Sequence, residues 1–226
     1  MAMYFLFLLP GMLLALWASL KTKLAFDQYS QVPSERRITG ARAAAMLLDY
    51  AGVTGVRIEM TSGFLSDHYD PTGRVLRLSE SVYSSDSLAA IGVACHEAGH
   101  AIQHATGYGP LGLRSTLVPL VNLASPGAYI FFVIGMLLHS MPMVWLGIVC
   151  FSAAVIFALV TLPVEFDASA RAKKLMVSAG IVSPEEERGA GEVLNAAFLT
   201  YVASAVTALL TLLYYLWRAG VFSRRD

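Results

Sequence analysis

Four long apolar stretches constrain this chain more than any other feature, because each is long enough to cross a lipid bilayer. They cover residues 2–20, about 117–138, about 143–162 and 196–217. A membrane-spanning helix needs about 20 apolar residues, and it satisfies its own backbone hydrogen bonds inside lipid. Of the 226 residues, 56% are hydrophobic and 14% are charged, whereas soluble domains are about half apolar and a quarter charged. The sequence therefore predicts a mainly α-helical membrane protein with four transmembrane helices.

The first stretch is expected to remain in the protein as an anchor. It has no basic residues before its apolar core, and no clear small-x-small cleavage site precedes Lys21. A cleaved signal peptide normally has both features.

The distribution of Lys and Arg predicts the orientation in the membrane. The loop at about 139–142 has no Lys or Arg, so the positive-inside rule places residues 21–115 and 163–195 in the cytoplasm. With four spans, Arg218, Arg224 and Arg225 then lie on the opposite side, against the rule. The basic residues that support this orientation are Lys21, Lys23, Arg36, Arg37, Arg42, Arg171, Lys173 and Lys174.

The polar segments 21–115 and 163–195 are predicted to form a zincin-like α+β catalytic unit, within one metallopeptidase domain that covers residues 1–226. Turn and cap residues divide these segments into elements. We expect a helix over 40–51 capped by Thr39, a strand over 56–60, and a small β-hairpin of strands 64–69 and 74–78. A second helix runs from Ser85 or Asp86 to about Thr106, and a capping box at Ser183 starts a helix that continues into the fourth span.

The motif that carries chemistry is His96-Glu97-Ala98-Gly99-His100. On a helix, positions i and i+4 lie on one face, so both imidazoles can reach one ion. Glu97 lies beside them and can accept a proton from an activated water. Chance placement of these residue types produces the spacing in roughly 0.4% of such chains. The motif therefore predicts a zinc ion held by His96 and His100, with Glu97 as general base.

A catalytic zinc needs a third protein ligand and one open position. His104 lies about 12 Å along the helix from the first imidazole, too far for a shared ion, and His139 belongs to the opposite loop. His68, Glu165 and Asp167 remain. We favour Glu165, because a carboxylate at the end of an apolar span is costly without a partner. The alternative is that it is solvated or paired with an arginine.

Four segments, one of which contains the histidine motif, together resemble a known protein family. Residues 65–71 (LSDHYDP), 78–83 (LSESVY), 95–103 (CHEAGHAIQ) and 162–169 (LPVEFDAS) closely resemble the YugP-like neutral zinc metallopeptidases of bacterial membranes. The resemblance covers nearly the whole chain. It implies a multi-pass peptidase of the bacterial cytoplasmic membrane, with one Zn²⁺ per chain and Glu165 as third ligand.

That family is similar to the larger group of integral-membrane gluzincins. In that group the ligand Glu is followed four residues later by an Asp that orients a metal-binding His. Here that position is Ser169. Asp167 is two residues from Glu165 and is expected to point away from it on a regular helix.

The predicted function is hydrolysis of peptide bonds in protein or peptide substrates at the bilayer. His68, Tyr69 and Arg171 are candidates for stabilising the oxyanion, and His68 is the preferred one. Residues 74–78 are a candidate edge strand for an extended substrate. Net charge is zero, so nucleic acid is not an expected partner.

The alternative function is a membrane scaffold or regulator that binds zinc without catalysis. Structural zinc sites usually have four ligands, often cysteines. Cys95 and Cys150 are poorly spaced for such a site and are expected to be buried small hydrophobes. Metal transport is a weak third option, because the four spans contain almost no ionisable residues.

Overall fold

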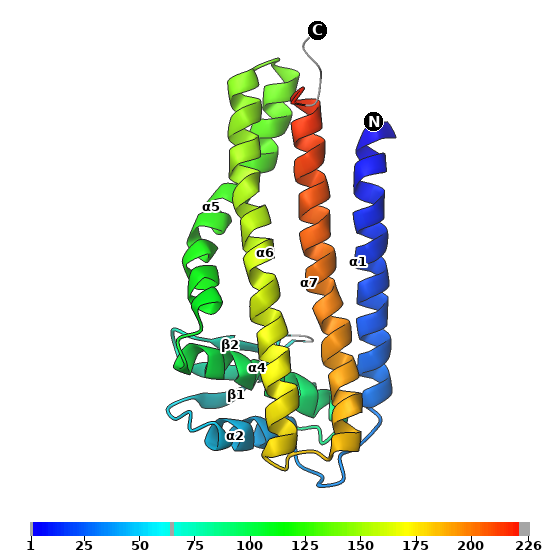
Figure 1. Cartoon of the computed structure of the whole chain (residues 1–226), viewed down its shortest axis with the longest axis vertical. Coiled ribbons are helices and arrows are strands. Elements are labelled where there is room, and N and C mark those ends of the chain that lie inside the picture. The colour runs from blue at the N-terminus through cyan, green and yellow to red at the C-terminus, as the bar shows by residue number, and fades with distance from the viewer. Residues whose placement is uncertain (1, 64–65, 222–226) are drawn as a thin grey trace. The chain divides into compact units, whose positions relative to one another are not determined.

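The computed structural model describes residues 2–63 and 66–221 (Figure 1). The first two residues of the predicted strand 64–69, Phe64 and Leu65, lie outside the described residues, as do Arg224 and Arg225. The chain divides into two compact units. The span unit contains Met1–Ala18, Gly112–Pro163 and Thr200–Asp226, and the polar unit contains Ser19–Leu111 and Val164–Leu199.

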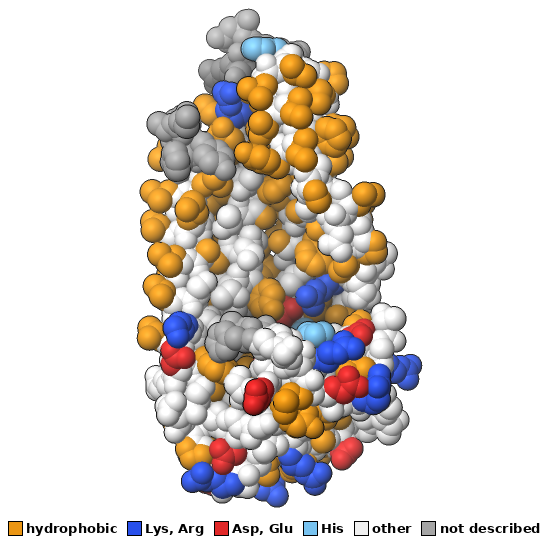
Figure 2. All heavy atoms as spheres, turned by 180° about the vertical axis from the view of Figure 1, so that it is seen from behind, with side chains coloured by type: hydrophobic (Ala, Val, Ile, Leu, Met, Phe, Trp, Pro, Cys, Tyr) orange, Lys and Arg blue, Asp and Glu red, His pale blue; other side chains and the backbone are white. Residues whose placement is uncertain are grey.

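Four helices are long and apolar enough to cross a membrane, as the sequence predicted. They are α1 (Ala2–Tyr29), α5 (Gly109–Leu137), α6 (Met141–Ser178) and α7 (Pro184–Arg218). Only 11%, 11%, 22% and 17% of their most apolar windows is buried within the protein, so lipid is the environment that suits these surfaces. On the face shown in Figure 2, hydrophobic side chains cover much of the helical surface, and charged side chains gather in a separate region.

Small residues bring the helices of the span unit together. A Cβ atom at Gly135 would lie 2.6 Å from the backbone nitrogen of Val144, and one at Gly147 would lie 2.6 Å from that of Phe132. Phe132 stacks on Tyr215 with ring centroids 3.8 Å apart. Close backbone approach of this kind is how membrane helices associate where no hydrophobic force acts between them.

The polar unit contains the predicted helices and strands together with one short helix that the sequence did not predict. They are α2 (Gly40–Tyr50), β1 (Arg57–Thr61), β2 (His68–Asp70), β3 (Val75–Ser79), α3 (Glu80–Tyr83) and α4 (Leu88–Ala105). Thr39 caps α2 by accepting from the backbone N–H of Arg42. At the start of α7, Ser183 and Glu186 form the predicted capping box, each accepting from the other's backbone N–H.

The strands form one mixed sheet in the order β1-β3-β2. β2 and β3 are the predicted antiparallel hairpin, and β1 pairs parallel with β3. Asp70 shapes the hairpin turn, because its Oδ1 accepts from the backbone N–H groups of Thr72 and Gly73. The proposal that residues 74–78 form an edge strand is wrong: β3 lies in the centre, and both of its edges are already paired.

Two details of the helices differ from the prediction. α4 begins at Leu88 rather than at Ser85 or Asp86, because Ser87 is the N-cap and accepts from the backbone N–H of Ala90. The short helix α3 was not predicted, since four residues carry too little periodicity to be recognised.

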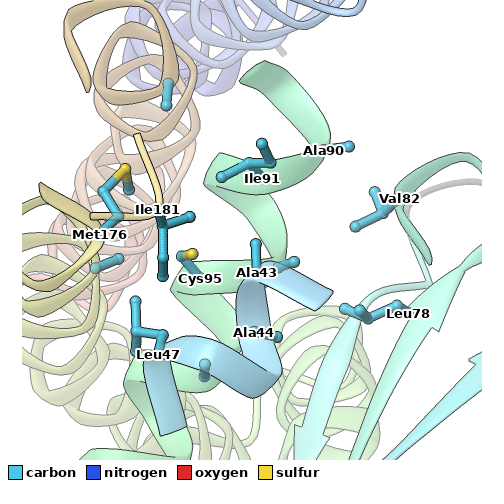
Figure 3. Close-up of a cluster of buried hydrophobic side chains, with 14 of the residues drawn as sticks. Ala43, Ala44, Leu47, Leu78, Val82, Ala90, Ile91, Cys95, Met176 and Ile181 are labelled. Atoms are coloured by element: carbon cyan, nitrogen blue, oxygen red, sulfur yellow. The ribbon is translucent and has the colours of Figure 1, made fainter. Parts of the chain in front are cut away.

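A hydrophobic core holds α4 between its neighbours (Figure 3). Ala43, Ala44 and Leu47 of α2 pack on one part of α4, and Leu78 and Val82 pack on another, with Met176 and Ile181 completing the cluster. Cys95 is fully buried in this core, as predicted, and burial raises the pKa of its thiol. The core fixes the position of the helix that carries the histidine motif.

Gly99 allows α4 to approach α6 closely. A Cβ atom at this position would lie 2.6 Å from the carbonyl oxygen of Ala168, which is too short for any real contact. Because this oxygen belongs to the backbone of Ala168, it cannot move away without moving α6. The glycine inside the motif therefore sets the separation of the two helices.

We predict that Gly99→Ala destabilises the protein by about 1–3 kcal/mol, the usual cost of overpacking. Thermal unfolding in detergent measures this loss. The matched control is Gly112→Ala on α5, where a Cβ would meet no atom within 4 Å. Equal melting temperatures for the two variants would contradict the prediction.

Candidate metal centre

α4 presents His96 and His100 on one face, one turn apart. Their ring centroids lie 4.8 Å apart and the rings meet edge to face. His100 is buried and His96 is half-buried. The core packing around α4 therefore leaves the two imidazoles aligned beside each other, as the spacing predicted.

α6 supplies a carboxylate to the same point. Glu165 is 1% exposed, and its Oε2 lies 3.2 Å from His96 Nε2 and 3.5 Å from His100 Nε2. The possible ligand atoms of these three residues all lie within 4.8 Å of one another. Pro163 does not end the preceding span, as α6 continues through it and carries Glu165 on the same helix.

The donor set fits zinc. Two imidazoles and one carboxylate, with a fourth position open, are typical of catalytic zinc sites. Atoms bound at about 2.0–2.1 Å to a tetrahedral ion lie about 3.3–3.4 Å apart. The separations of 3.2 and 3.5 Å from Glu165 Oε2 to the two Nε2 atoms bracket that value. The separations between the carboxylate and each imidazole therefore suit one ion of this size, and all three possible ligand atoms lie within 4.8 Å of one another.

The electrostatics of the cluster favour a cation. A carboxylate as buried as Glu165 is costly unless positive charge or hydrogen-bond donors face it. Burial disfavours the charged form of His100, but the carboxylates of Glu165 and Glu97 outweigh that effect and raise the pKa of His100 above its usual value. The arrangement of two imidazoles against a buried carboxylate suits a bound divalent cation.

The other candidate residues lie in different contacts. His68, on β2, is exposed; its Nδ1 lies 2.7 Å from the Ser66 carbonyl oxygen and its Nε2 3.4 Å from Arg77. Tyr69 is hydrogen-bonded to His104 at 2.9 Å. Among the described residues, the cluster around the imidazoles is completed by Glu165 and not by His68.

Asp167 and Arg171 form an ion pair at 2.6 Å along α6. Asp167 does not belong to the three-residue cluster, which agrees with the expectation that it points away from Glu165. It nevertheless reaches the centre indirectly, because its Oδ2 accepts from Gln103 Nε2 at 2.8 Å.

Sequence reasoning missed the partners of the imidazoles. Gln103 Oε1 lies 3.0 Å from His100 Nδ1, and Ser169 Oγ lies 3.1 Å from His96 Nδ1. Ser169 therefore takes the place of the missing Asp with a hydroxyl. The signal that the sequence offers for Gln103 is its place three positions after the second histidine, on the same side of the helix, but its partner Val164 on α6 is 61 residues away.

Comparisons with known proteins agree with this chemistry. A family model described as "Putative neutral zinc metallopeptidase" matches residues 4–220. The "Putative membrane protease YugP" of Bacillus subtilis (strain 168) is 50% identical over 214 residues, which cover 94% of this chain and 95% of the relative. No solved structure matches the chain.

We predict that Glu165→Ala removes most of the bound zinc from the purified protein, because the carboxylate is the charged member of the cluster. Elemental analysis of detergent-purified protein measures zinc per chain, with Glu185→Ala as control, an exposed glutamate on α7. Full retention of zinc in Glu165→Ala would assign the third ligand to another residue.

Zinc affinity is predicted to fall as pH decreases. An imidazole must lose its proton to bind a metal, and the raised pKa of His100 means that protons compete already above pH ~6.5, the ordinary histidine pKa. Below its pKa, each pH unit weakens binding about tenfold per protonated ligand. Chelator competition from pH 8 to 5.5 measures the profile. A zinc affinity that does not change with pH would exclude these imidazoles as zinc ligands. The control His104→Gln should show the same pH profile as the wild type.

Proposed function

This chain belongs to the neutral zinc metallopeptidase family, and from that premise we propose that it is a zinc-dependent endopeptidase of membrane or membrane-proximal proteins. In this proposal His96, His100 and Glu165 hold one zinc ion per chain. The observation that carries it is the convergence of two Nε2 atoms and one buried carboxylate oxygen within 4.8 Å. A structural zinc site would be closed by a fourth protein ligand, and the cluster has three members among the described residues.

Glu97 is the proposed general base. When bound, zinc would polarise the scissile carbonyl and acidify the attacking water. Glu97 takes a proton from that water and returns it to the leaving amine. Two facts support the role. Glu97 is half-buried next to His96 on α4, and its negative charge contributes to raising the pKa of His100. A carboxylate in this position stays close to the cluster without belonging to it.

His68 is the proposed stabiliser of the oxyanion. Its support is its exposed side chain on β2, an edge strand of the sheet that precedes the motif helix. Tyr69 and Arg171 are the other candidates, and they contact His104 and Asp167 respectively.

The proposed location is the bacterial cytoplasmic membrane, with residues 21–115 and 163–195 facing the cytoplasm and residues 1–226 acting as one domain. The excess of Lys and Arg in these two segments supports the orientation. Glu165 follows the apolar part of α6 directly, so the reaction takes place close to the membrane surface. Substrates are accordingly proteins or peptides that reach that surface.

Glu97→Gln is predicted to retain zinc and to lower peptide cleavage by about 10²- to 10⁴-fold, the usual contribution of a general base. A library of fluorescence-quenched peptides, assayed in detergent, measures cleavage, and elemental analysis measures zinc. Glu80→Gln, at an exposed glutamate of α3, is the control. Cleavage at the wild-type rate by Glu97→Gln would exclude the mechanism, and absence of cleavage in the wild type would favour a non-catalytic zinc protein.

A further inference from the structure

We infer that Gln103 is a positioning residue that holds His100 in its metal-binding form and ties it to α6. This inference rests on the proposed function, because it assumes that His100 binds zinc. Its basis is a buried chain of hydrogen bonds that runs from His100 through Gln103 to Val164 and Asp167. Gln103 touches neither the ion nor the substrate in this arrangement.

The orientation of the Gln103 amide is fixed by its partners on α6. Its Nε2 lies 2.8 Å from the carbonyl oxygen of Val164 and 2.8 Å from Asp167 Oδ2. A carbonyl oxygen and an ionised carboxylate only accept hydrogen bonds, so the amide nitrogen must face them. Gln103 is 0% exposed, so bulk solvent does not compete for its amide group. The amide oxygen must point to His100.

This orientation decides which nitrogen of His100 carries the proton. An amide oxygen only accepts, so Nδ1 of His100 must donate to Gln103 Oε1 across 3.0 Å. Nε2, the nitrogen that faces Glu165 at 3.5 Å, is then the one free to bind a metal. A histidine ligand is commonly held in this way through its second nitrogen.

Asp167 anchors the chain at its far end. Its Oδ2 also accepts from Arg171 Nε at 2.6 Å, and the Arg171 guanidinium lies 5.5 Å from the ring centre of Tyr108. The contact with Arg171 orients Asp167 toward the amide. One side chain of α4 is thus held by two groups of α6, the helix that also carries Glu165.

The partners at Nδ1 of both imidazoles are neutral, whereas the Glu165 carboxylate faces their Nε2 atoms. Gln103 contacts His100, and the hydroxyl of Ser169 contacts His96. A carboxylate in contact with an imidazole increases its basicity as a ligand. The charge of Asp167 is separated from His100 by the amide, so the imidazole is oriented without this increase.

The test is the apparent zinc affinity of detergent-purified protein, measured by competition with a chelator. Gln103→Met has similar length but can neither donate nor accept, and it should weaken zinc binding 10- to 100-fold, as loss of a partner of a metal-binding histidine usually does. Ile102→Val, at a buried neighbour on α4, is the control for packing and should bind zinc as the wild type does.

A charge exchange separates positioning from packing. Gln103→Glu alone sets two carboxylates against each other at the position of the 2.8 Å hydrogen bond and should bind zinc poorly. Gln103→Glu with Asp167→Asn restores a donor and an acceptor between these two side chains, although a carboxylate oxygen still faces the Val164 carbonyl, so the double variant should bind zinc more tightly than Gln103→Glu. The absorption spectrum of the cobalt-substituted protein should be disturbed in Gln103→Met and closer to that of the wild type in the double variant.

Wild-type affinity in Gln103→Met, or a double variant no better than Gln103→Glu, would overturn the inference while the zinc site stands. Wild-type affinity in His100→Ala would instead overturn the zinc site itself, and the role of Gln103 with it. The two failures are therefore distinguishable in one set of measurements.

Discussion

The buried carboxylate of Glu165 facing two imidazoles is the interaction on which the functional part of this protein depends. A carboxylate that is 1% exposed needs a compensating positive charge, and it can only meet one if α4 and α6 lie very close together. Gly99 allows that approach, and the core around α4 maintains it. Packing and chemistry therefore constrain the same two helices.

The helix α6 has an apolar first part and a later part that carries residues of the candidate metal centre. The apolar part of the helix suits lipid, and its continuation carries Glu165, Asp167 and Ser169. No loop intervenes, so the candidate ligand Glu165 and the His96 partner Ser169 lie on one helix. A helix defines such positions more accurately than a flexible segment does.

Hydrogen bonds behind the imidazoles distinguish this centre from one built with direct carboxylate partners. His96 contacts a hydroxyl and His100 an amide, and both partners are tied to α6. In the proposed site, the negative charge near a bound cation would come from Glu165 and Glu97. A smaller total of negative charge would leave that cation a stronger Lewis acid, which suits activation of water.

The sequence by itself determined the membrane class, the four spans and the histidine motif, because these depend on local hydropathy and on helical periodicity. It also indicated Glu165, since a carboxylate at the end of an apolar span needs a partner. Tertiary structure alone decided that β3 is a central strand and that Ser169 and Gln103 orient the imidazoles. Those features depend on which residues meet across distances such as the 61 positions between Gln103 and Val164, and no local pattern in a single sequence records such contacts.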